Sequence, residues 1–167
     1  MVRRGSVNYL DRLYASLNYL LPITAVLIFG TFLFSQFPML VLIFFPIFKV
    51  SQVLSIPIID IISIRFVVWF CVFIFVIRSY KVNHFVRFNA MQAILLDIVV
   101  ALVGAIAQIL IVILGQLKVL SFVLQIISSV TFLGITAAFL YTVFECIRGK
   151  YADKIPVISD VAYHQVR

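Results

Sequence analysis

Charged residues are scarce in this chain of 167 residues, where Asp, Glu, Lys and Arg together make up 11%. Hydrophobic residues make up 65%, and the mean hydropathy is +1.23. A water-soluble domain of this length needs far more charge on its surface. The composition therefore excludes a soluble globular protein and indicates an integral membrane protein.

Cysteine and histidine are also few, with two of each. Cys71 falls in the middle of one predicted span and Cys146 at the inner end of another, so their depths differ too much for a disulfide. His84 and His164 have no Cys or carboxylate ligands nearby, which favours headgroup contact over a metal site. The sequence has no CxxC, HExxH, GxSxG or glycine-rich phosphate motif. We therefore expect no catalytic residues, no metal and no cofactor, and the protein is not predicted to be an enzyme.

Four apolar segments are long enough to cross a hydrocarbon core of about 30 Å, which takes about 20 helical residues. They are residues 13–34, 61–77, 89–115 and 119–144. The first is predicted to be a retained span, because its apolar run is too long for a signal peptide and no Ser- and Arg-rich transit segment precedes it. The fold class is therefore an all-α integral membrane protein with four transmembrane helices in one domain over residues 1–167.

A fifth apolar segment covers residues 37–58. It is interrupted by Pro38, Pro46 and Pro57, and Lys49 lies in its middle. A straight lipid-facing helix there would leave backbone groups unpaired and place a charge in hydrocarbon. We expect a kinked segment that is interfacial or re-entrant on the outer side.

Basic residues decide the orientation of these spans. With the N-terminus inside, ten basic residues lie on the inner side and three on the outer side. The outer three are Lys49, Arg65 and Lys118. This distribution fits the positive-inside rule and places both termini inside, with a short amphipathic tail at residues 155–166. The net charge of +7 lies in short juxtamembrane clusters that suit anionic lipid, so no nucleic-acid partner is expected.

Small and polar residues form a stripe on the third predicted span when its residues are plotted at 100° per residue. Such stripes allow close helix packing and hydrogen bonding in lipid, and packing seams are commoner than pathways. The last predicted span has a similar polar face, and the two faces are expected to meet or to line something together. The candidate pathway or helix-packing face consists of Asn89, Gln92, Asp97, Gly104 and Gln108 on the third span and Gln125 and Ser129 on the last span. A basic loop on the inner side contains Arg78, Lys81, His84 and Arg87. Both interpretations of the stripe stay open at this point.

Asp97 is the acidic residue of this stripe. An ionised carboxylate at the bilayer centre costs about 2.5–3.5 kcal/mol on insertion scales. Counting about 20 residues back from the outer end of the span places Asp97 at the inner interface, whereas a strong tilt of the helix would submerge it. We expect an intermediate position, a few ångströms below the inner headgroups. There it could pair with Arg87 or another base of the inner side, or hydrogen-bond to Gln92. Asp60 and Arg65 are five residues apart and are not expected to pair.

Four stretches of the chain resemble a known family. They are DRLYASLNYLLP (residues 11–22), FLFSQFPML (32–40), NHFVRFNAMQAILLDI (83–98) and RGKYADKIPVISDVAYHQVR (148–167). The chain is similar along nearly its whole length to the twenty-kilodalton subunit family of the translocon at the inner envelope membrane of chloroplasts, including plastid-encoded and cyanobacterial members. The resemblance implies four helical spans with both ends in the stroma. It also implies a role in protein import across the plastid inner envelope, or a location in the cyanobacterial plasma membrane.

Size limits what one copy can do. Four helices of about 10 Å diameter pack around their own side chains and enclose no bore for a polypeptide. A channel component would therefore need other translocon membrane subunits or a homo-oligomer around it, with precursor polypeptides and membrane lipids as further partners. One alternative is a non-conducting assembly scaffold. A small-solute or ion transporter using Asp97 and the glutamines is disfavoured, because no inverted repeat is evident.

Overall fold

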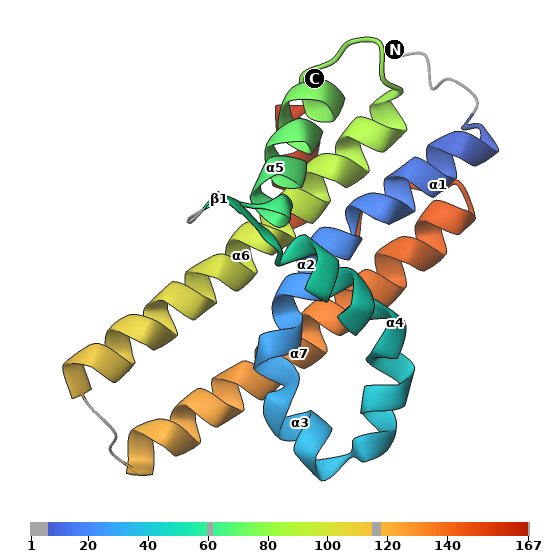
Figure 1. Ribbon diagram of the computed structural model, residues 1–167. Helices are drawn as coiled ribbons and strands as arrows, with labels where there is room; N and C mark the ends of the chain where they lie inside the picture. Colours follow the sequence, from blue (N-terminus) through green and yellow to red (C-terminus); the bar gives the residue numbers. More distant parts are fainter. Residues whose placement is uncertain (1–6, 60–61, 115–117, 167) are drawn as a thin grey trace.

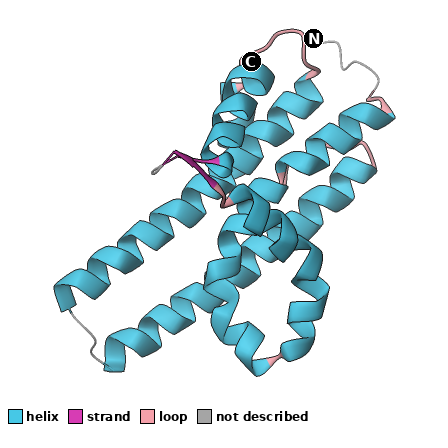
Figure 2. Cartoon of the chain, in the orientation of Figure 1, coloured by secondary structure: helices cyan, strands magenta, loops and turns pink. Residues whose placement is uncertain are grey.

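The structure, a computed structural model, describes residues 7–59, 62–114 and 118–166 (Figure 1). Helices make up nearly all of this part of the chain, with one short pair of strands (Figure 2). The elements are α1 (Tyr9–Asn18), α2 (Leu20–Val26), a 3₁₀ helix (Leu27–Gly30), α3 (Thr31–Gln36), α4 (Pro38–Leu54), β1 (Pro57–Ile59), β2 (Ile62–Ser63), α5 (Ile64–Cys71), a π-helix (Val72–Ile77), α6 (His84–Leu114), α7 (Lys118–Ile147) and α8 (Ile158–Gln165).

Within the described residues, three helical segments are long and apolar enough to cross a membrane: Tyr9–Gln36, His84–Leu114 and Val119–Ile147. The remaining predicted span, residues 61–77, is not confirmed. It contains eight α-helical and six π-helical residues, which extend about 21 Å and fall short of a hydrocarbon core of about 30 Å. The helices also extend beyond the apolar runs, since α6 begins at His84 and not at Asn89.

The first span is helical from Tyr9 to Gln36 but is interrupted along its length. A capping box between Asn8 and Asp11 starts α1. Pro22 lies in the first turn of α2 and has no amide hydrogen, so the hydrogen-bond ladder breaks where α1 ends and α2 begins. The span is therefore built from short consecutive helices.

The segment of residues 37–58 is mostly helical. Pro38 is the first residue of α4, a position where its missing amide costs nothing, and Pro46 lies inside the helix. In Figure 1, α4 turns back sharply from the end of α3, and it packs against α2, α3 and α5. Whether the segment is interfacial or re-entrant in the membrane stays a prediction. An antiparallel pair of strands, β1 and β2, then joins α4 to α5, a feature that the all-α prediction missed.

The described ends of the chain lie at one end of the bundle, together with the turn between the π-helix and α6 (Figure 1). Two contacts hold this terminal end together. Arg12 Nη1 donates to the Ile147 carbonyl at 3.2 Å, and Asn83 Nδ2 donates to Asp11 Oδ2 at 3.0 Å. We call the opposite end, where α6 ends and α7 begins, the far end.

Phenylalanine rings fill the core where α3, α4 and α7 meet. The centroid of Phe132 lies 5.2 Å from that of Phe34 and 5.3 Å from that of Phe44. Gly30 allows this approach, because a Cβ at that position would lie 2.7–2.8 Å from the rings of Phe34 and Phe132. The glycine is therefore required by packing and not by a turn.

Burial is uneven along the two long helices. The buried residues of α6 all lie between Phe85 and Val100, in the half nearest the terminal end. The buried residues of α7 are Phe132, Ile135, Thr142 and Cys146. In the first span, 50% of the most apolar stretch is buried. The corresponding share is 17% in α6 and 11% in α7. The far halves of α6 and α7 thus project from the packed part of the described chain.

The C-terminal tail folds back onto the bundle. Its short helix α8 packs on α6, with Ser159, Ala162 and Val166 buried. The apolar face of the predicted amphipathic tail is therefore covered by the chain itself.

Candidate functional site

The candidate residues of α6 differ in burial according to their distance from the terminal end. Asn89 and Gln92 are fully buried and Asp97 is 8% exposed. Gly104 is half-buried and Gln108 is exposed. The predicted stripe is therefore a buried polar segment followed by a segment with little cover from the described chain.

Asn89 and Gln92 belong to a buried polar cluster at the terminal end. The Tyr19 hydroxyl lies 2.9 Å from Asn89 Oδ1 and 2.6 Å from Gln92 Oε1, and its single proton is shared between them. Cys146 Sγ on α7 also donates to Asn89 Oδ1 at 3.2 Å. Gln92 Nε2 donates to the Ala152 carbonyl at 2.9 Å and to Ser159 Oγ at 2.8 Å.

This cluster joins the first span, α6, α7 and the C-terminal tail. Buried amides need partners, and the partners here come from segments up to 73 residues apart in sequence. The amide groups are occupied by contacts within the chain, which is what a packing role requires.

Asp97 belongs to a second cluster, centred on an ion pair with Arg65 of α5. The guanidinium also donates to the Leu21 carbonyl at 2.6 Å through Nη2 and to Thr24 Oγ1 at 3.0 Å through Nη1. Arg65 therefore joins α5 to both α2 and α6. Asp97 is thirteen residues into α6, about 20 Å from its start, so the pair lies near the middle of the helix.

Two sequence predictions about these charges are wrong. Arg65 was assigned to the outer side, but its side chain reaches into the bundle and binds Asp97. Arg87 was offered as the partner of Asp97, but its Nε donates to the Ile77 carbonyl at 2.9 Å and its guanidinium lies over the ring of Tyr80. The predicted pairing of Asp97 with Gln92 is likewise replaced by the contacts of the first cluster.

A cavity of about 460 Å³ lies beside the ion pair. Apart from Arg65 and Asp97, its lining is mainly apolar and includes Phe66, Trp69 and Phe70. A charged pair in an apolar cavity is the kind of site that could hold a small solute.

The remaining candidate residues lie toward the far end or in the basic segment. A Cβ on Gly104 would meet only Phe29, at 3.5 Å, so this glycine permits close packing without requiring it. On α7, Gln125 and Ser129 are half-buried, and Ser129 Oγ donates to the Gln125 carbonyl of its own helix at 2.8 Å. Whether the polar faces of α6 and α7 meet stays a prediction.

The basic segment is only partly a loop. Arg78 and Lys81 are exposed in the turn before α6, whereas His84 and Arg87 lie in the first turn of the helix and are half-buried. His84 Nδ1 lies 3.2 Å from the hydroxyl of Tyr151 in the C-terminal tail. This part of the predicted loop therefore helps to dock the tail.

Sequence reasoning missed Arg65 and Tyr19 as members of these clusters. The signal for Arg65 was its position as a lone base next to a long apolar run, which indicates a partner inside the membrane. Tyr19 gave no such signal, because tyrosines are common near membrane interfaces.

The chain was compared with known proteins. It matches the family described as "Chloroplast import apparatus Tic20-like" over residues 6–162. It is 35% identical over 169 residues to a "Tic20 family protein" of Synechocystis sp., covering 100% of this chain and 99% of that protein. It is also 37% identical over 101 residues to "Protein TIC 20-II, chloroplastic" of Arabidopsis thaliana, covering 60% of this chain and 46% of that protein.

Proposed function

Because the chain belongs to the Tic20-like family of the chloroplast import apparatus, we propose that it is a membrane subunit of the protein-import translocon and contributes to the path of precursor proteins. The resemblance predicted from the sequence is confirmed at the level of the family. The membrane is the inner envelope of the plastid, or the plasma membrane in a cyanobacterium. Partner subunits complete the path.

The observation that carries the proposal is the uneven burial of α6 and α7. Near the terminal end, side chains such as Tyr19, Phe85 and Phe88 fill the space between helices, so no polypeptide can pass there. The far halves of α6 and α7 have little cover in the described chain. A path bordered by this subunit therefore runs along the far halves.

Two polar side chains lie at similar depth on these far halves. Gln108 is six residues before the end of α6, and Gln125 is seven residues after the start of α7, so both lie about 10 Å from the far end. A glutamine side chain facing lipid loses hydrogen bonds that water or another polypeptide would supply. A passing chain or a neighbouring subunit would supply them here.

Site-specific photocrosslinking during import of an arrested precursor tests the proposal. Probes at Gln108 and Gln125 should crosslink to the precursor. Matched controls are Ile106 and Val123, which are exposed and two residues away from the probes, and so point to another side of the same helices. Equal crosslinking from probes and controls, or none to the precursor, would contradict a path along this face.

A non-conducting scaffold is the second candidate function. It is favoured by the occupation of Asn89, Gln92 and Asp97 in contacts within the chain. In the same experiment a scaffold gives crosslinks to neighbouring membrane subunits only. A solute transporter would instead use the cavity beside Arg65 and Asp97, and flux through liposomes that contain the purified protein alone would identify it.

A further inference from the structure

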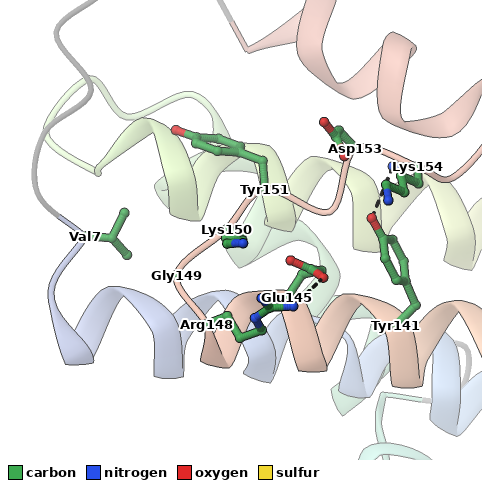
Figure 3. A pocket seen from close by; sticks show the side chains of 9 residues that line it. All are labelled: Val7, Tyr141, Glu145, Arg148, Gly149, Lys150, Tyr151, Asp153 and Lys154. Carbon is green, nitrogen blue, oxygen red and sulfur yellow. Dashed lines mark hydrogen bonds and ion pairs between the residues drawn. The ribbon is translucent and has the colours of Figure 1, made fainter.

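A second cavity lies at the terminal end, where the chain leaves α7 and turns back toward α8. Its volume is about 520 Å³, within the range of about 300–1,000 Å³ for small-ligand sites. Figure 3 shows that the side chains around it come from the end of α7 and from the segment that follows, with Val7 from the segment before α1. Tyr141, Glu145, Arg148, Lys150 and Lys154 are among them.

The backbone around this cavity is held in place. Gly149 has a φ of +69°, which lets the chain reverse directly after α7. The amides of Gly149 and Lys150 donate to the carbonyls of Cys146 and Glu145, both at 2.9 Å. Capping of these carbonyls means that the negative end of the helix presents fewer bare acceptors to an anion. The following segment is anchored because the Lys154 amide donates to the Tyr141 hydroxyl at 3.3 Å.

The charges around the cavity are mostly positive. Three bases and two acids line it. Arg148 Nη1 lies 3.6 Å from Glu145 Oε1, so these two charges largely offset each other. The ammonium groups of Lys150 and Lys154 have no ion pair within the described residues. Besides Glu145, the one carboxylate of the described chain that lines the cavity is that of Asp153. The Tyr141 hydroxyl accepts from an amide and keeps its own proton to donate.

Apolar residues continue from the cavity along the outside of α7. Phe144 and Ile147 are 56% and 62% exposed on the last turns of this helix. In a membrane such side chains face acyl chains, and the lysines beside them lie at headgroup level. Basic residues at this depth, next to a lipid-facing helix, suit a ligand with an oxyanion at one end and hydrocarbon at the other.

We propose that this cavity binds the headgroup of an anionic glycerolipid from the leaflet at the terminal end of the bundle. Lys150 and Lys154 contact the oxyanion, the Tyr141 hydroxyl donates to it, and the acyl chains run along Phe144 and Ile147. The site does not depend on the proposed role in import.

Native mass spectrometry of the purified full chain tests the site. The protein is equilibrated in nanodiscs with equal amounts of phosphatidylglycerol and phosphatidylcholine and then released into detergent. The wild type should retain more phosphatidylglycerol than phosphatidylcholine. The variant K150Q/K154Q should bind phosphatidylglycerol about 30-fold more weakly, since a base beside an anionic headgroup contributes about fivefold. In detergent no anionic surface surrounds the bases outside the cavity, so they should contribute little.

The matched control is R78Q/K81Q, which removes two exposed bases at the same end of the bundle without touching the cavity. It should lose less than about threefold in affinity. Both variants should unfold like the wild type in pure phosphatidylcholine, because the four side chains are exposed. Equal losses in the two variants, or no loss in K150Q/K154Q, would overturn the proposal. Displacement of the lipid by millimolar inorganic phosphate would show an anion site without lipid selectivity, and would overturn it too.

Discussion

The ion pair between Arg65 and Asp97 predicts that the two partners are not equally important for stability. Asp97 is 8% exposed and has Arg65 as its hydrogen-bond partner in the described chain. Replacing Arg65 by Leu leaves this carboxylate buried and unpaired and also removes the contacts to Leu21 and Thr24. Loss of one partner of a buried pair costs about 3–5 kcal/mol, and we expect Arg65→Leu to fall in that range.

Replacing Asp97 by Leu should cost less. The guanidinium of Arg65 keeps the Leu21 carbonyl and the Thr24 hydroxyl as acceptors, and its side chain is 25% exposed. We expect a loss of about 1–3 kcal/mol for Asp97→Leu. In the double variant neither charge is left alone, so its loss should be smaller than the sum of the single losses by at least about 1 kcal/mol.

The assay is unfolding of the purified protein in mixed micelles with increasing sodium dodecyl sulfate. The chain has one tryptophan, Trp69, which lines the cavity beside the ion pair and reports on its opening by fluorescence, while circular dichroism reports on the helices. The control is Phe75→Leu, which changes a side chain that is 69% exposed. Single losses that add to within about 0.5 kcal/mol, or a larger loss for Asp97→Leu than for Arg65→Leu, would refute the reasoning.

Two further substitutions test the packing. Gly30→Ala should destabilise the protein by about 1–3 kcal/mol in the same titration, because the new methyl group would lie 2.7–2.8 Å from two phenylalanine rings. Gly134→Ala is the control, since no neighbouring side chain lies within 4 Å of the position that its methyl group would take, and it should be neutral or stabilising by up to about 1 kcal/mol. Gln92→Leu should loosen the C-terminal tail and speed tryptic cleavage after Lys154 about tenfold, because buried partners lose their hydrogen bonds. Gln108→Leu, at an exposed position, should leave that cleavage rate unchanged.

The long helices could be predicted from the sequence because hydropathy is a local property. Apolar runs near residues 13–34, 89–115 and 119–144 are each long enough to cross a bilayer. The structure has a long helix at the second and third of them, and a series of short consecutive helices at the first. The exact bounds could not be predicted, because helix formation continues past the apolar run. His84 and Arg87 extend α6 since their partners, Tyr151 and the Ile77 carbonyl, lie in other segments.

The location of Arg65 was missed because a count of basic residues takes no account of contacts between helices. Counting basic residues treats a charge near a span end as a surface charge. A guanidinium can lie deeper when other helices provide acceptors, and here these are a carboxylate 32 residues away and a backbone carbonyl 44 residues away. The prolines of residues 37–58 predicted a kinked segment, but α4 continues through Pro46 from Pro38 to Leu54. The short pair of strands that follows α4 has no hydropathy signal.

Val100 is the last buried residue of α6, and this limits how a precursor could pass this subunit. Before that residue, Asn89, Gln92 and Asp97 hold the first span, α5 and the tail together, so a path along them would have to break those contacts. Beyond it, Gln108 makes no such contact in the described chain. Loss of Asp97 should therefore lower the amount of assembled protein, and loss of Gln108 should lower import at unchanged assembly. If both losses acted only through assembly, the far halves would be a docking face and the subunit a scaffold beside the path.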